Sequence, residues 1–412
     1  TTADDNTAVG SYALTTNTTG GQNTALGKNA LQVNTTASYN TAIGYDSLVA
    51  NTTGANNTAI GYEAGKANTT GAQNTALGSG ALQANTTADG NTAVGFDALT
   101  ANSTGARNVS LGWHALDSNT TGDDNVAVGY DALDDNTTGT KNVAVGNYAG
   151  DAITTGGSNN CFGYDAGTDI TTGSNNCFFG TKAGANTTTP DFNCAFGQEA
   201  LEANSTGASN IAIGFRALEA NTTGTDNVAV GAYALDANTT ADDNTAVGKA
   251  ALGANTTGTQ NVAIGKGALL NNTDQSNNTA VGYHALDANT GGSSLVAIGN
   301  NTLVANTTGD NNTAVGANAL DANTTASGNT ALGYAALGAN TTGTENVSVG
   351  AYSMLDNTTG GQNTALGESA LANNTTASNN TAIGKNTLVA NTTGAQNTAV
   401  GALALDANTT AN

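Results

Sequence analysis

The chain has 412 residues, of which 54 are glycine and only 10% are charged, and 31 Asp and Glu against 9 Lys and Arg give a net charge of −22. A nucleic-acid-binding protein needs basic stripes that face phosphates, and the sequence has none. No run approaches the roughly 18 apolar residues of a membrane span. We therefore expect neither a nucleic-acid partner nor a membrane span, and three cysteines are too few for a disulfide framework.

A single short motif, seventeen residues long, repeats through the whole chain. It starts at an asparagine, defined here as position 0, and recurs 24 times without insertion or deletion as N-[TV]-A-[VIL]-G-x-x-A-L-x-A-N-T-T-G-x-x. Position +4 is glycine in all 24 copies and position +8 is leucine in 19. The first copies supply the marker residues, which are Asn6, Asn23 and Asn40 at position 0, Gly10, Gly27 and Gly44 at +4, Leu14 and Leu31 at +8, and Asn34 and Asn51 at +11.

A repeat of this length is too short for a helical repeat, which needs roughly 33 residues or more. The Asn, Thr and Gly content is also poor for helices, whereas positions 0 to +4 alternate as a strand does. The sequence predicts an all-β fold, a parallel β-solenoid (β-roll) that runs as one domain over residues 1–412. Its 24 coils, stacked about 4.8 Å apart, would make a rod of roughly 115 Å.

The alternation also predicts which side chains point inward. We expect the aliphatic or β-branched residues at +1 and +3, with leucine at +8, to lie inside, and Asn at 0 and Ala at +2 to face outward. The small outward alanines would let another chain approach closely. Asn at 0 and +11 is expected to form side-chain amide ladders, and Thr at +13 to bond similarly at the corner.

Residues 147–200 keep the register but change content, whereas residues 1–146 and 201–412 are regular. Leucine at +8 is replaced there by Gly150, Gly167 and Gly184. Bulk returns as aromatic side chains, which are Phe162, Phe178, Phe179, Phe192 and Phe196. We interpret this as a repacked core in which Phe fills the volume that Leu vacated. A kink or a binding collar is the alternative.

The three cysteines fall in the same variant coils. Cys177 and Cys194 both occupy +1 in adjacent coils, where a Cα separation of about 4.8 Å permits a disulfide. The alternative, which we prefer, is two buried thiols that act as small apolar residues. Cys161 lies at +2, on the expected outward face, so it could contact another chain.

Neither end of the sequence resembles a capping unit. Thr1-Thr2 match +12 and +13 of a preceding repeat, and Asn408-Thr409-Thr410 match an ordinary turn. Because solenoids normally carry distinct caps, we expect both ends to be uncapped and the stack to continue beyond them.

No constellation of catalytic residues is found. His114 and His284 are the only histidines and lie ten coils apart, so they cannot share a metal or a triad in one chain. Nucleotide-binding glycine motifs in a strand-to-helix context are absent. We therefore predict no enzyme activity, no cofactor and no metal. Calcium on paired acids such as Asp123-Asp124 is the alternative to a solvated acidic surface.

Aromatic residues recur just after the conserved glycine. The set at +5 that could face a ligand is Tyr45, Tyr62, Phe96, Trp113 and Tyr130. These rings could cover a corner or a chain interface, or could stack on the sugars of a glycan. The Asn-Thr-Thr turns are also N-glycosylation sequons, although a structural turn explains them equally well.

The run N-T-A-V-G-x-x-A-L resembles the β-roll head repeats of trimeric autotransporter adhesins. The longer N-T-A-V-G-Y-x-A-L-x-x-N-T-T-G pattern is similar to arrays in phage tail fibres and bacterial surface proteins. The resemblance implies a homotrimeric, adhesive, extracellular rod on a cell surface or a virion appendage, although the adhesin repeat is shorter than the repeat of this chain.

We therefore expect a structural fibre or filament shaft with an adhesive or spacing role. Self-association as a homotrimer or as an end-to-end filament is the expected partner relation. The alternatives are an ice-binding solenoid, which would use the Thr ladders, and a glycan-binding module that uses the aromatic residues.

Overall fold

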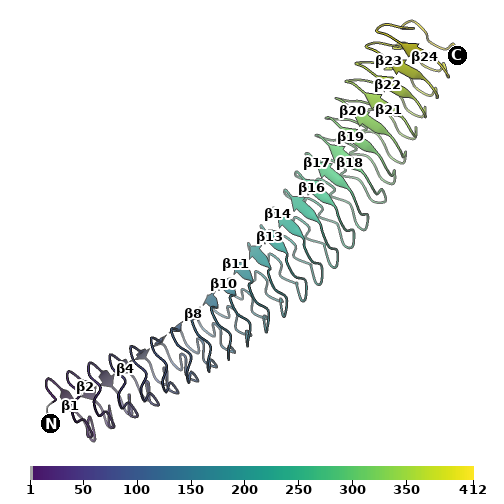
Figure 1. The fold of residues 1–412 in the computed structure, drawn as a ribbon. Helices are drawn as coiled ribbons and strands as arrows, with labels where there is room; N and C mark the ends of the chain where they lie inside the picture. The colour runs from purple at the N-terminus through teal and green to yellow at the C-terminus, as the bar shows by residue number, and fades with distance from the viewer. Residues whose placement is uncertain (1–2) are drawn as a thin grey trace. The chain divides into compact units, whose positions relative to one another are not determined.

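The structure, a computed structural model, describes residues 3–412 as two units that divide between Ala208 and Ser209. Within each unit, successive coils carry one three-residue strand each, directly after position 0, and the strands stack in chain order (Figure 1). The expectation for Thr1-Thr2 falls outside the described residues. Among the residues that are described, no helix is long and apolar enough to cross a membrane.

The first unit holds twelve strands, β1 Thr7–Val9, β2 Thr24–Leu26, β3 Thr41–Ile43, β4 Thr58–Ile60, β5 Thr75–Leu77, β6 Thr92–Val94, β7 Val109–Leu111, β8 Val126–Val128, β9 Val143–Val145, β10 Asn160–Phe162, β11 Cys177–Phe179 and β12 Cys194–Phe196. The second unit holds β13 Ile211–Ile213, β14 Val228–Val230, β15 Thr245–Val247, β16 Val262–Ile264, β17 Thr279–Val281, β18 Val296–Ile298, β19 Thr313–Val315, β20 Thr330–Leu332, β21 Val347–Val349, β22 Thr364–Leu366, β23 Thr381–Ile383 and β24 Thr398–Val400.

Each strand pairs in parallel with the next strand of its unit, and each position pairs with its own copy in the following repeat. Thr41 opposes Thr58 in the first unit, and Thr245 opposes Val262 in the second. The predicted all-β, parallel β-solenoid with 17-residue coils is confirmed. That the two units form one uninterrupted solenoid stays a prediction.

Hydrogen bonds between coils extend well beyond the short strands. In the coil that contains β4, Thr58 donates its backbone N–H to the carbonyl of Asn74 in the next coil at 2.9 Å. Further along the same coil, Gly65 and Ala67 donate to carbonyls of the next coil at 2.9 Å, and Glu63 donates to the preceding coil at 2.9 Å. Because backbone groups all around the coil find partners in its neighbours, a strand of three residues is enough to hold the stack together.

The predicted orientation of the strand is wrong. Ala25 and Ala42 at +2 are fully buried, whereas Leu26 at +3 is 46% exposed. Leu31 at +8 is buried as expected, and Leu14 in the first coil is half-buried. The interior is too narrow for two β-branched residues, because the side chain at +8 already fills the space beside the alanine at +2. The alanines therefore form the core and cannot serve as a contact face for another chain.

The segment after the strand is a series of left-handed turns. Asp46 at +6 and Leu48 at +8 have φ of 54° and 49°, a region that non-glycine residues seldom occupy. The conserved glycines at +4, such as Gly27 and Gly44, have φ of 139° and 136°. A Cβ at Gly27 would also collide with the carbonyl oxygen of Gly44 in the next coil. These two constraints explain why Gly10 and its 23 counterparts are invariant.

In the variant coils, one phenylalanine fills the core as predicted, whereas the other phenylalanines do not. Phe178 at +2 is fully buried, and its ring occupies the space where side chains at Gly167 and Gly184 would lie. Ile153 and Ile170 at +11 are also fully buried and supply further bulk. Bulk has therefore moved from position +8 to positions +2 and +11.

The remaining phenylalanines lie on the outside, which corrects the prediction for them. Phe162, Phe179 and Phe196 at +3 form an outward stack with ring centroids 4.4 and 4.7 Å apart. Phe192 precedes position 0 and is 62% exposed. The three stacked phenylalanines face outward because +3 does so in every coil.

The cysteines follow the same corrected orientation. Cys177 and Cys194 oppose each other in register on β11 and β12, where both are free thiols and only half-buried. Cys161 at +2 is a free thiol that is 1% exposed. An interchain contact through Cys161 is therefore contradicted, because its side chain lies in the core.

Candidate functional site

Two asparagines in each coil form ladders that run from coil to coil. Asn40 at position 0 accepts the N–H of Asn57 on its Oδ1 at 2.9 Å, and its Nδ2 donates to the carbonyl of Gly54 at 3.0 Å. Asn51 at +11 donates its Nδ2 to the same carbonyl at 2.9 Å and to Oδ1 of Asn34 at 3.1 Å. Asn6 and Asn23 repeat the position-0 pattern, with Asn23 N–H donating to Asn6 Oδ1 at 2.9 Å. These amides are largely buried and bond within and between the coils, so they serve the stack.

One residue interrupts the position-0 ladder. Leu295 still donates its backbone N–H to Oδ1 of Asn278 at 3.0 Å. Its side chain has no oxygen, however, to accept the N–H of Asn312 in the following coil. Coil stacking continues across this point, since Val296 donates to the carbonyl of Asn312 at 3.0 Å.

The threonine ladder lies one position earlier than predicted. Thr35 and Thr52 at +12 each donate Oγ1 to the +12 carbonyl of the next coil, at 3.1 and 3.0 Å. Thr36 at +13 is exposed. An ice-binding surface would need outward T-x-T strands, and none of the 24 strands that the structure describes has that sequence. The threonine hydroxyls at +12 therefore link successive coils.

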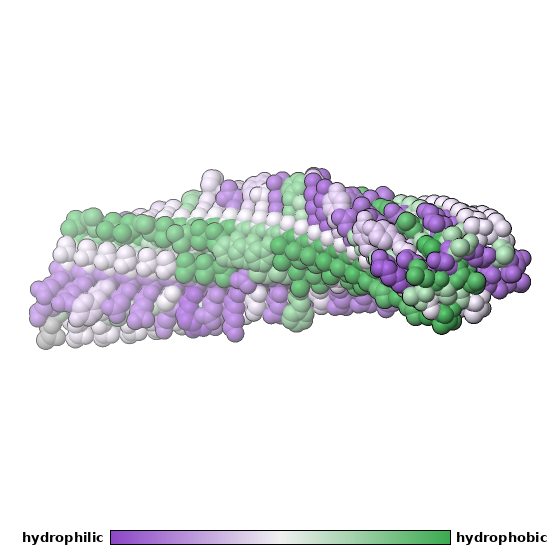
Figure 2. Space-filling view, turned by 90° about the horizontal axis from the view of Figure 1, so that it is seen from above, coloured by the Kyte–Doolittle hydropathy of each residue, from purple (hydrophilic) through white to green (hydrophobic). Residues whose placement is uncertain are grey.

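The side chains at +1 and +3 form the outer side of the strands, called here the outward strand face. Those at +3 are aliphatic or phenylalanine, and those at +1 are mostly threonine or valine. Figure 2 shows bands of hydrophobic residues on the visible side of the coils. Leu26, Leu77 and Ile213 at +3 are 46%, 44% and 40% exposed. None of the described strands contains a charged residue. This face is therefore uncharged and rich in apolar side chains, although it is exposed to water.

A row of aromatic rings lies beside this face in the first unit. Phe96, Trp113, Tyr130, Tyr148 and Tyr164 follow one another with centroid separations of 5.7, 5.8, 5.3 and 6.1 Å. We call these five residues the aromatic row. Phe96 is 49% exposed and Trp113 is 54% exposed. Exposed, mutually packed rings can stack on apolar or sugar surfaces.

Of the aromatic residues predicted at +5, the structure brings only some together. Tyr45 and Tyr62 form a separate stacked pair at 5.5 Å, with the ring planes 9° apart. Phe96, Trp113 and Tyr130 join the aromatic row. Tyr148 at +6 also joins it, which the sequence analysis did not foresee, because a ring at +6 can turn toward the +5 rings of both neighbouring coils.

Next to the aromatic row, acidic side chains at +6 and +9 converge on His114. The ligand atoms of His114, Asp117 and Asp134 all lie within 4.8 Å of one another. Burial, followed by the charges of Asp117 and Asp131, raises the pKa of Asp134 to about 6. Burial likewise raises the pKa of Asp117. The sequence analysis treated His114 as isolated, although the register of the repeat places +6 and +9 of adjacent coils side by side.

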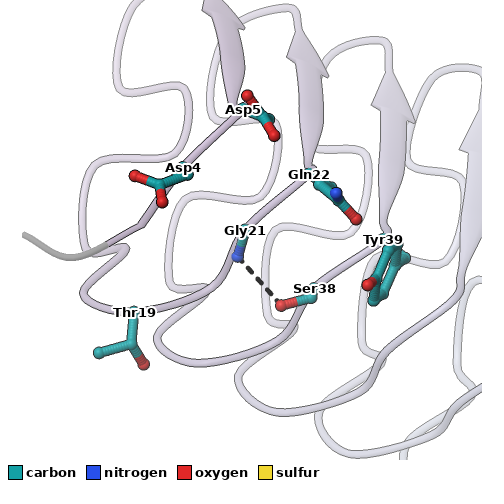
Figure 3. A pocket seen from close by; sticks show the side chains of 7 residues that line it. All are labelled: Asp4, Asp5, Thr19, Gly21, Gln22, Ser38 and Tyr39. Atoms are coloured by element: carbon teal, nitrogen blue, oxygen red, sulfur yellow. Dashed lines mark hydrogen bonds between the residues drawn. The ribbon is translucent and has the colours of Figure 1, made fainter.

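A shallow hollow lies over the first described coils. Its volume is about 330 Å³, and residues of three successive coils line it (Figure 3), namely Asp4, Asp5, Thr19, Gly21, Gln22, Ser38 and Tyr39. Gly21 donates its N–H to Ser38 Oγ across the hollow at 3.0 Å. The lining offers two carboxylates, a tyrosine and the hydroxyls of Thr19 and Ser38.

No protein family matches the chain, and no curated protein is significantly similar to it.

Proposed function

We propose that the chain forms the shaft of an extracellular fibre, with a spacing or adhesive role on a cell surface or a virion appendage. The observation that carries the proposal is the unbroken register of the repeat, in which every position stacks on its own copy. Such an arrangement yields a long uniform surface in place of a single pocket. The resemblance to adhesin and tail-fibre repeats supports the same role.

The proposed partner is another copy of this chain, bound through the outward strand face. If each partly exposed side chain at +3 contributes about 70 Å² of accessible surface, the twelve +3 residues of one unit contribute about 800 Å². That area equals one partner's share of a standard protein–protein interface. The charge distribution favours the same surface. With a net charge of −22, two copies repel each other, and the uncharged strands give the surface on which they can meet.

Light scattering coupled to size-exclusion chromatography tests this association. The wild-type chain is expected to elute with the mass of two or more copies. Leu26→Lys with Leu77→Lys places charge on the outward strand face and should give a monomer. Thr36→Lys with Thr87→Lys adds the same charge at the exposed +13 corner and should leave the mass unchanged. A wild-type chain that stays monomeric at every concentration would refute lateral association.

Small-angle X-ray scattering tests the shaft itself. Twelve coils at about 4.8 Å give each unit a length of about 55 Å, so the particle must have a maximum dimension at least that long and a thin cross-section. A compact, near-spherical particle would rule out a shaft.

A second candidate function, glycan binding, is favoured by the aromatic row. A glycan screen should show binding to the wild-type chain and loss of binding in Trp113→Ala with the fold intact. Tyr283→Ala is the matched control, because Tyr283 occupies the same +5 position in the second unit, and its neighbours at +5 are Lys266 and Asn300. A screen without hits, or equal loss in both variants, would exclude this function.

A further inference from the structure

The richest group of titratable side chains in the first unit lies on two adjacent coils. His114 and Asp117 follow β7 at positions +6 and +9, and Asp131 and Asp134 follow β8 at the same positions. The ligand atoms of His114, Asp117 and Asp134 are within 4.8 Å of one another. Asp131 lies beside them, with its Oδ1 3.8 Å from His114 Nδ1. Two coils thus supply one imidazole and three carboxylates to a single small volume.

These carboxylates lack the partners that buried oxygens need. Asp117, Asp131 and Asp134 each have a buried Oδ1 with no hydrogen-bond partner among the residues that the structure describes. Among the described residues, none of these three carboxylates forms an ion pair with a lysine or an arginine. A buried carboxylate oxygen without a donor or a cation is costly. Three of them beside a single imidazole favour a bound cation.

The imidazole is held between aromatic rings. The ring of Phe96 stacks on His114 at 5.9 Å with an interplanar angle of 26°, and Trp113 meets it edge-on at 5.7 Å. This packing restricts the orientation of the imidazole next to the carboxylates. A ligand group with restricted rotation loses less entropy when it binds an ion.

We propose that His114, Asp117 and Asp134, with Asp131 beside them, bind one divalent first-row transition-metal ion of the Zn²⁺ or Co²⁺ type. An imidazole combined with carboxylates suits such ions, whereas Ca²⁺ and Mg²⁺ prefer sites built from oxygen alone. The ion would offset three crowded negative charges and would link two successive coils. This site is independent of the proposed shaft function, which requires no metal.

The second histidine provides an internal comparison. His284 also occupies +6, and its Nδ1 lies 2.8 Å from Oδ2 of Asp287 at +9. The next coil places Asn301 and Val304 at +6 and +9, so no second carboxylate joins the pair. A single partnered carboxylate satisfies His284, which makes it a matched control at the same position of the repeat.

The test uses the only tryptophan of the chain, Trp113, as a reporter. Co²⁺ is titrated into the full chain after removal of metal with a chelator, and Trp fluorescence and visible Co²⁺ absorption are recorded. We expect saturable quenching with one ion per chain, reversal by Zn²⁺, and little competition by Ca²⁺ or Mg²⁺.

Variants then assign the ligands. His114→Gln should weaken Co²⁺ binding by about tenfold or more, and Asp117→Asn with Asp134→Asn should abolish it. His284→Gln should bind as the wild-type chain does. Circular dichroism confirms the fold of each variant, and His114→Gln remains informative if the double variant does not fold. Absence of saturable quenching up to about 1 mM Co²⁺, equal effects of His114→Gln and His284→Gln, or equal competition by Ca²⁺ would overturn the proposal.

Discussion

At the scale of single residues, the buried asparagine amides determine how the coils close and stack. Nδ2 of Asn244 and Nδ2 of Asn255 both donate to the carbonyl of Gly258 at 2.9 Å, which closes the turn of their own coil. Oδ1 of Asn244 accepts the N–H of Asn261 from the next coil at 3.0 Å. A side-chain amide carries two donors and an acceptor without a charge, so one asparagine can close its own coil and bond to the next coil at the same time.

Restoring asparagine at the one interrupted position should stabilise the stack. Leu295→Asn supplies the acceptor that the N–H of Asn312 lacks, and a net gain of about 1 kcal/mol is expected for one hydrogen bond. Hydrogen exchange of the Asn312 amide should slow by about fivefold. Asn278→Leu is the converse variant and should speed exchange at the amide of Leu295. Unchanged exchange at Asn312 in the restored variant would contradict this account of the ladder.

The cysteines should differ sharply in reactivity. Burial raises the pKa of Cys161 to about 12, so its thiol should not react with a thiol reagent before the chain unfolds. Cys177 and Cys194 are half-buried, and burial also raises their pKa, so they should react slowly in the folded state.

The measurement is a thiol count before and after denaturation without reductant. Two thiols should react in the folded chain and three in the unfolded chain, and the variant with Cys177→Ser and Cys194→Ser should show none until it unfolds. A count of one in the unfolded wild-type chain would show a disulfide between Cys177 and Cys194, contrary to the free thiols described here.

At the scale of one coil, the fold follows from the period, but the orientation of the strand does not. The exact period of the repeat, with the alternation from 0 to +4, predicted the parallel stack correctly. Alternation alone does not say which face is buried, and the β-branched or aliphatic side chains of Thr41 and Ile43 were expected in the core in place of Ala42. The packing around Gly65 shows why alanine is inside. A Cβ at Gly65 would lie 3.0 Å from Cδ2 of Leu48 in the preceding coil and 3.7 Å from Cβ of Ala59 in the same coil. The size of the cavity, which no local pattern encodes, decided the orientation.

The variant coils offer a test of this size constraint. Phe178→Ala should leave a cavity next to Gly184 and cost about 3–5 kcal/mol. Gly184→Leu alone should clash with the Phe178 ring, which lies 2.6 Å from where the Cβ would be placed. The double variant restores the regular pair of Ala at +2 and Leu at +8, so it should recover most of the lost stability. Chemical denaturation measures all three, and a double variant as unstable as the sum of the single variants would contradict complementary packing.

At the scale of the whole molecule, charge and apolar surface are separated. The acidic residues lie outside the strands, while the strands present uncharged side chains to solvent, many of them aliphatic or aromatic. Composition predicted the acidity but not the apolar surface, because the strand was oriented the wrong way. The convergence of His114 with Asp117 and Asp134 was missed for a related reason. Residues one full repeat apart are neighbours here, and a search for motifs along the chain does not detect them.

Electron microscopy of the native material, with antibody labelling and a measurement of mass per unit length, would show whether the chain forms a fibre shaft. We expect label along the shaft of thin fibres and two or more chains for each coil step of about 4.8 Å, joined through their outward strand faces. Label confined to compact particles, with none on fibres, would contradict the proposal that the chain forms a fibre shaft. Fibres with a single chain per step would contradict lateral association through the outward strand face.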